Sequence, residues 1–338
     1  MILPSAPRIL RHAFAAVIVL GGVFAVAPRE GVFAVAPEGA AEEVAPVELR
    51  SERFSVVVSP ARGGSLLAMR VKRGEAWLDL MPDPGSRGSS WLMLPYSNRI
   101  RDGRFVYDGR EYQLTGAKNH AIHGDVRARP WTIVEQTPSS LVLSFDSAEF
   151  PDFNWPWPLR ATVGIRLSGD QVEQTLRLEN LGETTMPAGF GWHPYYRRWL
   201  SRDGEPVVLG FTAPRIHPDT DADGLPDGPP EPVPADLDFS TPRELGSRRI
   251  DACFAGFNGQ ATIEWPESGV TLTYACSPNV THLICFGPED RPVLAIEPAA
   301  NANDGINRLA AGEGDSGVIP LTAGGVLEAS FTISAQVR

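Results

Sequence analysis

The most constraining feature of the sequence is a stretch of strict alternation between residues 159 and 180. On both sides of a Ser168-Gly169-Asp170 turn, every second residue is apolar apart from one glutamine, and these residues are Ala161, Val163, Ile165, Leu167, Val172, Gln174, Leu176 and Leu178. Successive side chains of a strand point to opposite faces, so this pattern predicts an antiparallel hairpin with one solvated face. A hairpin of this length indicates a fold built mainly from β-strands.

Composition supports an all-β chain. The 338 residues include 33 glycines and 31 prolines, which would interrupt a helical bundle, and no window shows a sustained apolar stripe of helical period. Further strands are expected at residues 54–58, 140–145, 207–211, 261–265, 270–275, 283–286, 293–297 and 326–333. No internal linker is long enough to divide the chain, so residues 42–338 are expected to form a single antiparallel domain.

The charge and the cysteines exclude several function classes. With 30 Lys and Arg against 41 Asp and Glu, the net charge of −11 leaves no basic face for nucleic acid. Three cysteines are too few for a disulfide scaffold and lack zinc-site spacing. Cys276 and Cys285 flank a turn at 277–279, so they either form a disulfide across a hairpin in an oxidising compartment or remain thiols.

The N-terminus has the pattern of a targeting segment. Arg8 and Arg11 precede an uncharged, largely apolar run over residues 13–28, which is short for a membrane span and typical of a secretory signal. A seven-residue duplication (22–28 and 31–37) lies in the same region. We therefore expect residues 1–41 to be a leader, the mature chain to have no membrane span, and the protein to be exported to the periplasm. The alternative is a start codon assigned upstream of a cytoplasmic protein.

Four segments combine apolar runs with polar side chains that can do chemistry. Residues 94–100 end an apolar run in Asn98 and Arg99, and residues 119–124 bring two histidines next to a glycine. Residues 189–196 place His193 among aromatic residues, and residues 293–298 leave Glu297 at the end of an apolar strand. Each segment alone has an ordinary structural explanation, but their combination is informative.

In this order, the segments resemble the aldose 1-epimerases, the galactose mutarotase-like proteins. The resemblance covers residues 50–333 and rests on the boxes at 97–100, 103–105, 109–114, 122–124, 193–196, 250–254 and 296–298. It implies an antiparallel β-supersandwich whose curved face holds a sugar. It also implies a small-molecule aldose as substrate, with neither a cofactor nor a metal.

The resemblance implies that Glu297 is a base and His193 an acid. Interconverting the anomers of an aldose requires opening the ring, turning the aldehyde and closing the ring again. Opening needs a base for the C1 hydroxyl proton and an acid for the departing ring oxygen. A carboxylate and an imidazole suit these roles if modest environmental shifts bring both groups to titrate near neutrality.

The same resemblance assigns the sugar-binding residues. His123 is expected near the ring oxygen, Arg99 to hold the sugar or the catalytic groups with its fork of donors, and Asp251 to accept from ring hydroxyls. Asn98 belongs to the same binding set. We further expect a stacking wall from Trp192 and Tyr195, for which the alternative is packing in the core.

Two departures bear on the substrate. The box at 193–196 reads His-Pro-Tyr-Tyr where well-known galactose-active members have a His-Ser-Tyr-Phe type, so galactose itself is in doubt. Arg197 and Arg198 follow it, and we favour a solvated edge over an anionic-sugar site for this pair. A non-catalytic carbohydrate-binding or sensor protein on the same fold is the alternative function, whereas a glycosidase normally needs two flanking carboxylates.

An acidic segment opens like a calcium loop. Residues 219–224 read Asp-Thr-Asp-Ala-Asp-Gly, but the twelfth position of an EF-hand loop, which requires Glu, is Pro230. Neighbouring prolines also prevent flanking helices. The sequence therefore excludes an EF-hand and leaves open a calcium loop of another kind.

Overall fold

The alternating segment forms the expected hairpin. In the computed structural model, which describes residues 44–338 except 84, 86–88, 117–119, 221 and 290, strands β12 (Leu159–Ser168) and β13 (Gln171–Asn180) pair in register from Leu159 opposite Asn180 to Ser168 opposite Gln171. The apolar set faces the core and the other set is largely exposed. The predicted leader, residues 1–41, lies outside the described residues. Among those described, no helix has the length and apolar character needed to cross a membrane.

The hairpin lies within a nine-stranded antiparallel sheet. Its strand order is β10-β11-β12-β13-β26-β22-β21-β16-β19. Besides β12 and β13, its strands are β10 (Thr132–Gln136), β11 (Ser140–Asp146), β16 (Val208–Phe211), β19 (Arg243–Glu244), β21 (Gln260–Trp265), β22 (Val270–Cys276) and β26 (Val326–Val337).

A second sheet of eleven strands has the order β1-β2-β3-β5-β15-β24-β23-β20-β17-β18, with β4 added to β3. All pairs are antiparallel. The strands are β1 (Val47–Arg50), β2 (Phe54–Ser59), β3 (Ser65–Arg73), β4 (Ala76–Asp79), β5 (Ser90–Met93), β15 (Gly191–Arg197), β17 (Arg215–His217), β18 (Glu231–Pro232), β20 (Ile250–Ala255), β23 (His282–Gly287) and β24 (Val293–Ala299).

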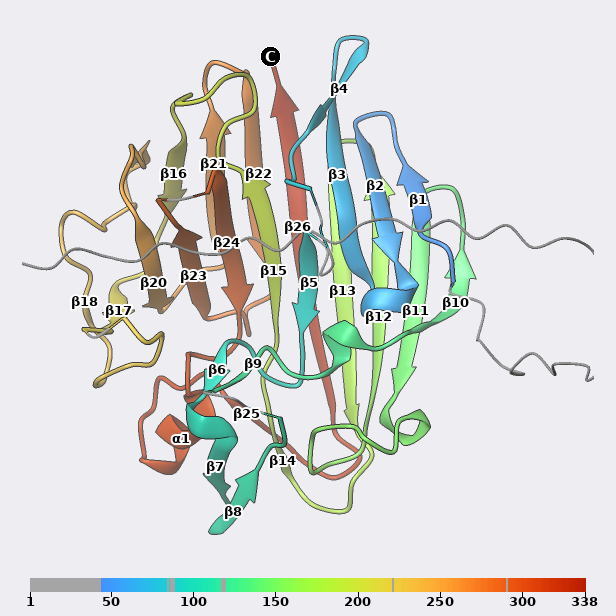
Figure 1. Cartoon of the computed structure of the whole chain (residues 1–338), viewed down its shortest axis with the longest axis vertical. Coiled ribbons are helices and arrows are strands. Elements are labelled where there is room, and N and C mark those ends of the chain that lie inside the picture. Colours follow the sequence, from blue (N-terminus) through green and yellow to red (C-terminus); the bar gives the residue numbers. More distant parts are fainter. Residues whose placement is uncertain (1–43, 84, 86–88, 117–119, 221, 290) are drawn as a thin grey trace, which may run out of the picture. The chain divides into compact units, whose positions relative to one another are not determined.

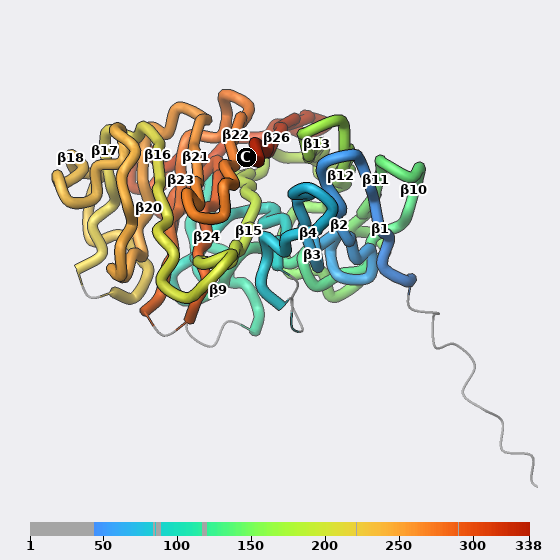
Figure 2. Tube along the Cα trace, turned by 90° about the horizontal axis from the view of Figure 1, so that it is seen from above, coloured from blue at the N-terminus to red at the C-terminus, as the bar shows by residue number. Residues whose placement is uncertain are grey.

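The two sheets pack face to face. In Figure 1 the green strands of the nine-stranded sheet lie behind the blue strands β2 and β3, and Figure 2 views the same layers from above. Side chains from both sheets form one apolar core. Across it, Trp192 of β15 packs on Phe331 of β26 with ring centroids 5.5 Å apart, and the Tyr274 hydroxyl donates to the Tyr196 hydroxyl at 2.8 Å. The all-β supersandwich architecture predicted from the sequence is confirmed.

Smaller elements gather at one end of the sheets (Figure 1). They are three two-stranded ladders and one short helix, namely β6 (Arg99–Ile100) with β9 (Ala121–Ile122), β7 (Arg104–Tyr107) with β8 (Arg110–Gln113), β14 (Met186–Ala188) with β25 (Ile319–Leu321), and α1 (Gly305–Ala310). The predicted strands all form within one or two residues of the expected ends, except that β26 continues four residues past the expected end, to Val337.

The hairpin expected between Cys276 and Cys285 does not form, so this prediction is wrong. β22 ends at Cys276 in the nine-stranded sheet, whereas β23, which contains Cys285, belongs to the eleven-stranded sheet. The turn at 277–279 therefore carries the chain from one layer to the other. All three cysteines are free thiols, so the disulfide does not form.

Candidate active site

A polar cavity of about 190 Å³ lies on the face of the eleven-stranded sheet that points away from the core. Seven residues predicted from the sequence line it together, although they come from five separate parts of the chain. Its lining consists of Trp91, Asn98, Arg99, Ile122, His123, Arg127, His193, Tyr195, Asp251, Ile284, Phe286 and Glu297.

Strand alternation decides which aromatic residues of β15 reach this cavity. His193 and Tyr195 line it, whereas Trp192 and Tyr196, one residue out of phase, point into the core. The indole of Trp192 is only 1% exposed and packs against Phe190 and Phe331. The expectation that Trp192 forms a stacking wall is therefore wrong. The structure shows the alternative, in which Trp192 packs in the core.

His193 and Glu297 face each other on adjacent central strands. Pairing of Gly191 with Ala299 and of Tyr195 with Ala295 places His193 level with Glu297 across β15 and β24. The Nε2 atom of His193 lies 3.2 Å from Oε1 of Glu297. The side chains are only 7% and 3% exposed, so the contact is almost completely screened from bulk water.

Burial favours the neutral form of both groups. It lowers the pKa of His193 to about 3, with the positive charge of Arg127 acting in the same direction. It raises the pKa of Glu297 well above its usual value, as does the charge of Asp251, while Arg99 opposes the change. These shifts exceed the modest ones expected from the sequence. At neutral pH the pair thus holds one proton, and burial favours it on the carboxyl group.

Glu297→Gln is expected to stabilise the fold, and more so as the pH rises. The folded chain keeps a proton on Glu297 that the unfolded chain releases above about pH 4.5. Wild-type stability therefore falls as the pH rises from there toward the folded pKa, by at most about 1.4 kcal/mol per pH unit. The glutamine variant has no carboxyl group at this position, so its stability does not fall with pH for this reason. Thermal unfolding should show a larger gain in Tm for the variant at about pH 7.5 than at about pH 4.

Exposed Glu289 supplies the control for this measurement. Glu289→Gln should change Tm by the same small amount at both pH values. If Glu297→Gln behaved like this control, the carboxyl group of Glu297 would not be held neutral by burial.

Asn98, Arg99 and His123 enter the cavity from loop ends. Asn98 and His123 both adopt positive φ, +55° and +63°. The backbone N–H of Asn98 donates to Nδ1 of His123 at 3.2 Å. When His123 is neutral, its proton therefore lies on Nε2, which makes that atom a donor. Arg99 Nη1 donates to the side-chain oxygen of Asn98 at 3.2 Å, which links the two residues.

A close backbone contact fixes this arrangement. Gly124, next to His123, has φ +65°, and a Cβ there would lie 1.8 Å from the carbonyl oxygen of Leu94. Only glycine allows the segment after β5 and the segment after β9 to approach so closely.

Sequence reasoning missed Trp91 and Arg127. Trp91 lies opposite His193 in the ladder between β5 and β15, with ring centroids 4.2 Å apart. The Arg127 guanidinium lies 5.8 Å from the centroid of the Trp91 ring. Neither belongs to a motif, and the pairing of β5 with β15, a hundred residues apart, was the signal needed to find Trp91.

Arg197 and Arg198 do not line the cavity. Arg197 donates to the carbonyl oxygen of Met81 at 3.1 Å. Arg198 is buried and donates to the carbonyl oxygens of Gly246 and Arg248 at 2.6 and 3.0 Å. The expectation that both arginines are solvated is therefore wrong for Arg198, which stabilises a loop junction instead.

The acidic segment forms its own turns. Asp219 accepts from the N–H of Gly224 at 3.0 Å, Asp223 from that of Leu225 at 2.7 Å, and Asp227 from the N–H and hydroxyl of Thr220 at 2.6 Å. Asp221 lies outside the described residues. In the part of the chain that the structure describes, no group of three or more His, Cys, Asp or Glu side chains is placed to hold a metal.

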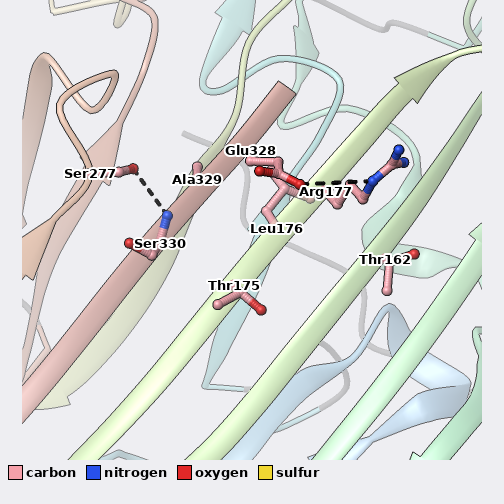
Figure 3. A pocket seen from close by; sticks show the side chains of 8 residues that line it. All are labelled: Thr162, Thr175, Leu176, Arg177, Ser277, Glu328, Ala329 and Ser330. Atoms are coloured by element: carbon pink, nitrogen blue, oxygen red, sulfur yellow. Dashed lines mark hydrogen bonds and ion pairs between the residues drawn. The ribbon is translucent and has the colours of Figure 1, made fainter. Parts of the chain in front are cut away.

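A larger, more open groove of about 430 Å³ crosses the outer face of the nine-stranded sheet (Figure 3). Its charged residues are Arg177 and Glu328, which are 46% and 75% exposed and approach to 3.9 Å. The rest of its lining is threonine, serine, leucine and alanine. This exposed ion pair is open to solvent, whereas the smaller cavity holds a buried histidine–carboxylate contact, so we place the chemistry in the smaller cavity.

Fold and cavity together define a class, a two-layer antiparallel β-protein with a histidine–carboxylate pair in a polar pocket. The sequence profile of the aldose 1-epimerase family matches residues 46–333. The chain belongs to that family.

Relatives and solved structures agree with this assignment. The uncharacterized protein YphB of Escherichia coli K12 is 28% identical over 255 residues, which span 70% of this chain and 84% of YphB. The crystal structure of a candidate aldose 1-epimerase from Escherichia coli K12 superposes with a TM-score of 0.74 at 24% identity, covering 87% of this chain and 99% of that one. A galactose mutarotase-like protein from Clostridium acetobutylicum gives 0.74 at 18% identity, covering 87% and 95%. Both structures share the fold.

Proposed function

We propose that the protein interconverts the α and β anomers of a free aldose by acid–base ring opening and closure. The observation that carries the proposal is the buried contact between His193 and Glu297 within a cavity also lined by Arg99, His123 and Asp251. Family membership adds independent support.

In the proposed reaction, Glu297 takes the proton of the C1 hydroxyl as the bond between C1 and the ring oxygen breaks. C1 becomes the aldehyde carbon, and the ring oxygen receives a proton from His193. Rotation about the C1–C2 bond presents the other face of the aldehyde. The two residues then exchange roles, because His193 removes the proton of the attacking hydroxyl and Glu297 returns one to the aldehyde oxygen.

These roles need the shared proton on His193, whereas burial favours it on Glu297. Transfer across the 3.2 Å contact interconverts the two arrangements without a proton from solvent. A bound sugar favours the charged arrangement, because its C1 hydroxyl donates to the carboxylate and its ring oxygen accepts from the imidazolium. Arg99 also favours the carboxylate. The sugar thus activates the pair by supplying directed hydrogen bonds to its charged form.

The other polar side chains can hold the ring. In the proposed complex Nε2 of His123 donates to the ring oxygen, Arg99 offers two parallel donors to adjacent hydroxyls, and Asp251 accepts from hydroxyls. Tyr195 and Trp91 provide aromatic walls beside His193, with ring centroids 4.8 and 4.2 Å from the imidazole.

Polarimetry on freshly dissolved α-glucose, α-galactose and a small aldose panel tests the proposal. Dialysed protein should accelerate equilibration of at least one sugar. If every sugar equilibrates at its spontaneous rate while calorimetry detects sugar binding, the alternative function, a carbohydrate-binding or sensor protein, replaces it. If there is neither acceleration nor binding, both functions are wrong.

We also propose that the protein works outside the cytoplasm, on the basis of Arg8, Arg11 and the apolar run that follows. Intact-mass measurement on protein from the native host should give a mass lacking approximately the first 41 residues. Recovery of a chain that still begins at Met1 from a cytosolic fraction would contradict export.

A further inference from the structure

The backbone of Gly224 lies against the side chain of Arg99. Gly224 has φ +79°, and a Cβ at this position would lie 2.4 Å from Nη1, 2.6 Å from Cζ and 3.0 Å from Nε of Arg99. The guanidinium therefore lies flat against a surface that only glycine provides. The loop that resembles a calcium site in sequence is a wall for the arginine of the cavity.

The segment that follows Glu297 holds this wall in place. Asn303 is buried, and its Nδ2 atom donates to the carbonyl oxygen of Gly224 at 2.7 Å. The next residue, Asp304, donates its backbone N–H to the carbonyl oxygen of Arg99 at 2.8 Å. Arg308 donates to the carbonyl oxygen of Gly228 at 2.7 Å. Consecutive residues thus hold both the backbone of Arg99 and the surface against which its guanidinium lies.

We infer that Gly224 and Asn303 are positioning residues that set the orientation of the Arg99 guanidinium for the substrate. This inference rests on the proposed function. A guanidinium recognises two adjacent oxygens only when its plane is fixed, because its donors have a rigid geometry. Asn98 contacts only one end of the group, at Nη1. The surface of Gly224 restricts the remaining freedom of the plane.

Gly224→Ala is the direct test. The added methyl group displaces the guanidinium, which is the far end of a flexible side chain, so the protein can still fold. The KM for the preferred aldose should rise by about 10–100-fold, the loss expected for one or two charge-assisted hydrogen bonds, while kcat changes by less than about threefold. Asn303→Ala should change KM in the same direction by a smaller factor.

Two control variants separate this effect from general damage. Gly228→Ala alters the same loop where an added Cβ meets no atom within 4 Å, and it keeps the carbonyl that accepts from Arg308, so KM should be unchanged. Gly312 has φ +83°, and a Cβ added there would also meet no atom within 4 Å. Gly312→Ala therefore reproduces the backbone strain of Gly224→Ala without a contact to Arg99. A rise in KM in either control equal to that of Gly224→Ala would overturn the inference.

A double-mutant cycle tests whether the effect passes through Arg99. Lysine lacks the planar group that the new methyl would displace, so Gly224→Ala should not raise KM further in an Arg99→Lys background. An equal penalty in both backgrounds would show that Gly224 acts elsewhere, and the inference would be wrong.

An NMR measurement distinguishes this inference from the proposed function. The side-chain Nε–Hε signal of Arg99, identified by its loss in Arg99→Lys, should shift or broaden in Gly224→Ala and remain in place in Gly228→Ala. A protein that accelerates no anomer but shows this change would contradict the proposed function and keep the positioning role. A protein that is active but shows no change would contradict the positioning role alone.

Discussion

Glu297→Gln should reduce turnover by about two to four orders of magnitude, the usual contribution of one acid–base group, while sugar affinity changes much less. Glutamine keeps the shape of the side chain but cannot take the C1 hydroxyl proton. Its amide still occupies a position 3.2 Å from His193 and can hydrogen-bond the sugar. Polarimetry gives the turnover and calorimetry the affinity.

Comparing Glu297→Gln with variants of the proposed sugar-binding residues separates an effect on the chemical step from an effect on binding. Asp251→Asn and Arg99→Lys should mainly raise KM, with turnover lost only as far as the sugar is misplaced. Exposed Glu289→Gln should have wild-type kinetics. A folded Glu297→Gln protein with near wild-type turnover would show that another group is the base.

His193→Gln is expected to cause a loss of similar size, about 10²–10⁴ in turnover, because a neutral amide cannot protonate the departing ring oxygen. The double variant with Glu297→Gln should be hardly slower than either single variant, since His193 and Glu297 share one proton and removing either stops ring opening.

If the losses of turnover in the double variant multiplied, His193 and Glu297 would not act together through one shared proton. Such losses would imply that each group exchanges its proton with solvent separately. Thermal unfolding of each variant is the control for folding, and Tyr195→Phe, which removes one hydroxyl from the cavity wall and keeps both His193 and Glu297, is the matched control for kinetics. Its turnover should fall much less than that of either variant of the pair.

Local alternation was sufficient to predict the strands but not their partners. The pattern at residues 159–180 contains its own turn, so both strands and their register follow from short-range sequence. The pairing of β5 with β15 joins segments a hundred residues apart, and nothing local indicates it. For this reason Trp91 and Arg127 went undetected, and the crossing between sheets after Cys276 looked like a hairpin.

One error was avoidable from the sequence. If His193 and Tyr195 face a cavity, the period of a strand requires Trp192 to face the other way. The pKa shifts were not predictable, because they depend on how completely the surrounding strands exclude water from Glu297 and His193. Nor was the role of Gly224, since its contact with Arg99 depends on loops brought together by the fold.

The central position of β15 and β24 has a consequence for how such a protein changes over time. Both strands have hydrogen-bonded neighbours on each side, so they belong to the part of the molecule that opens last. Asn98, Arg99 and His123, which we propose to hold the sugar, come instead from strand ends and connecting segments, which tolerate insertion and replacement. In the proposed function, proton transfer and substrate choice therefore depend on separate parts of the fold. Exchanging the segments around 99, 123 and 224 between relatives is expected to change the preferred sugar while the two strands keep His193 and Glu297 in contact.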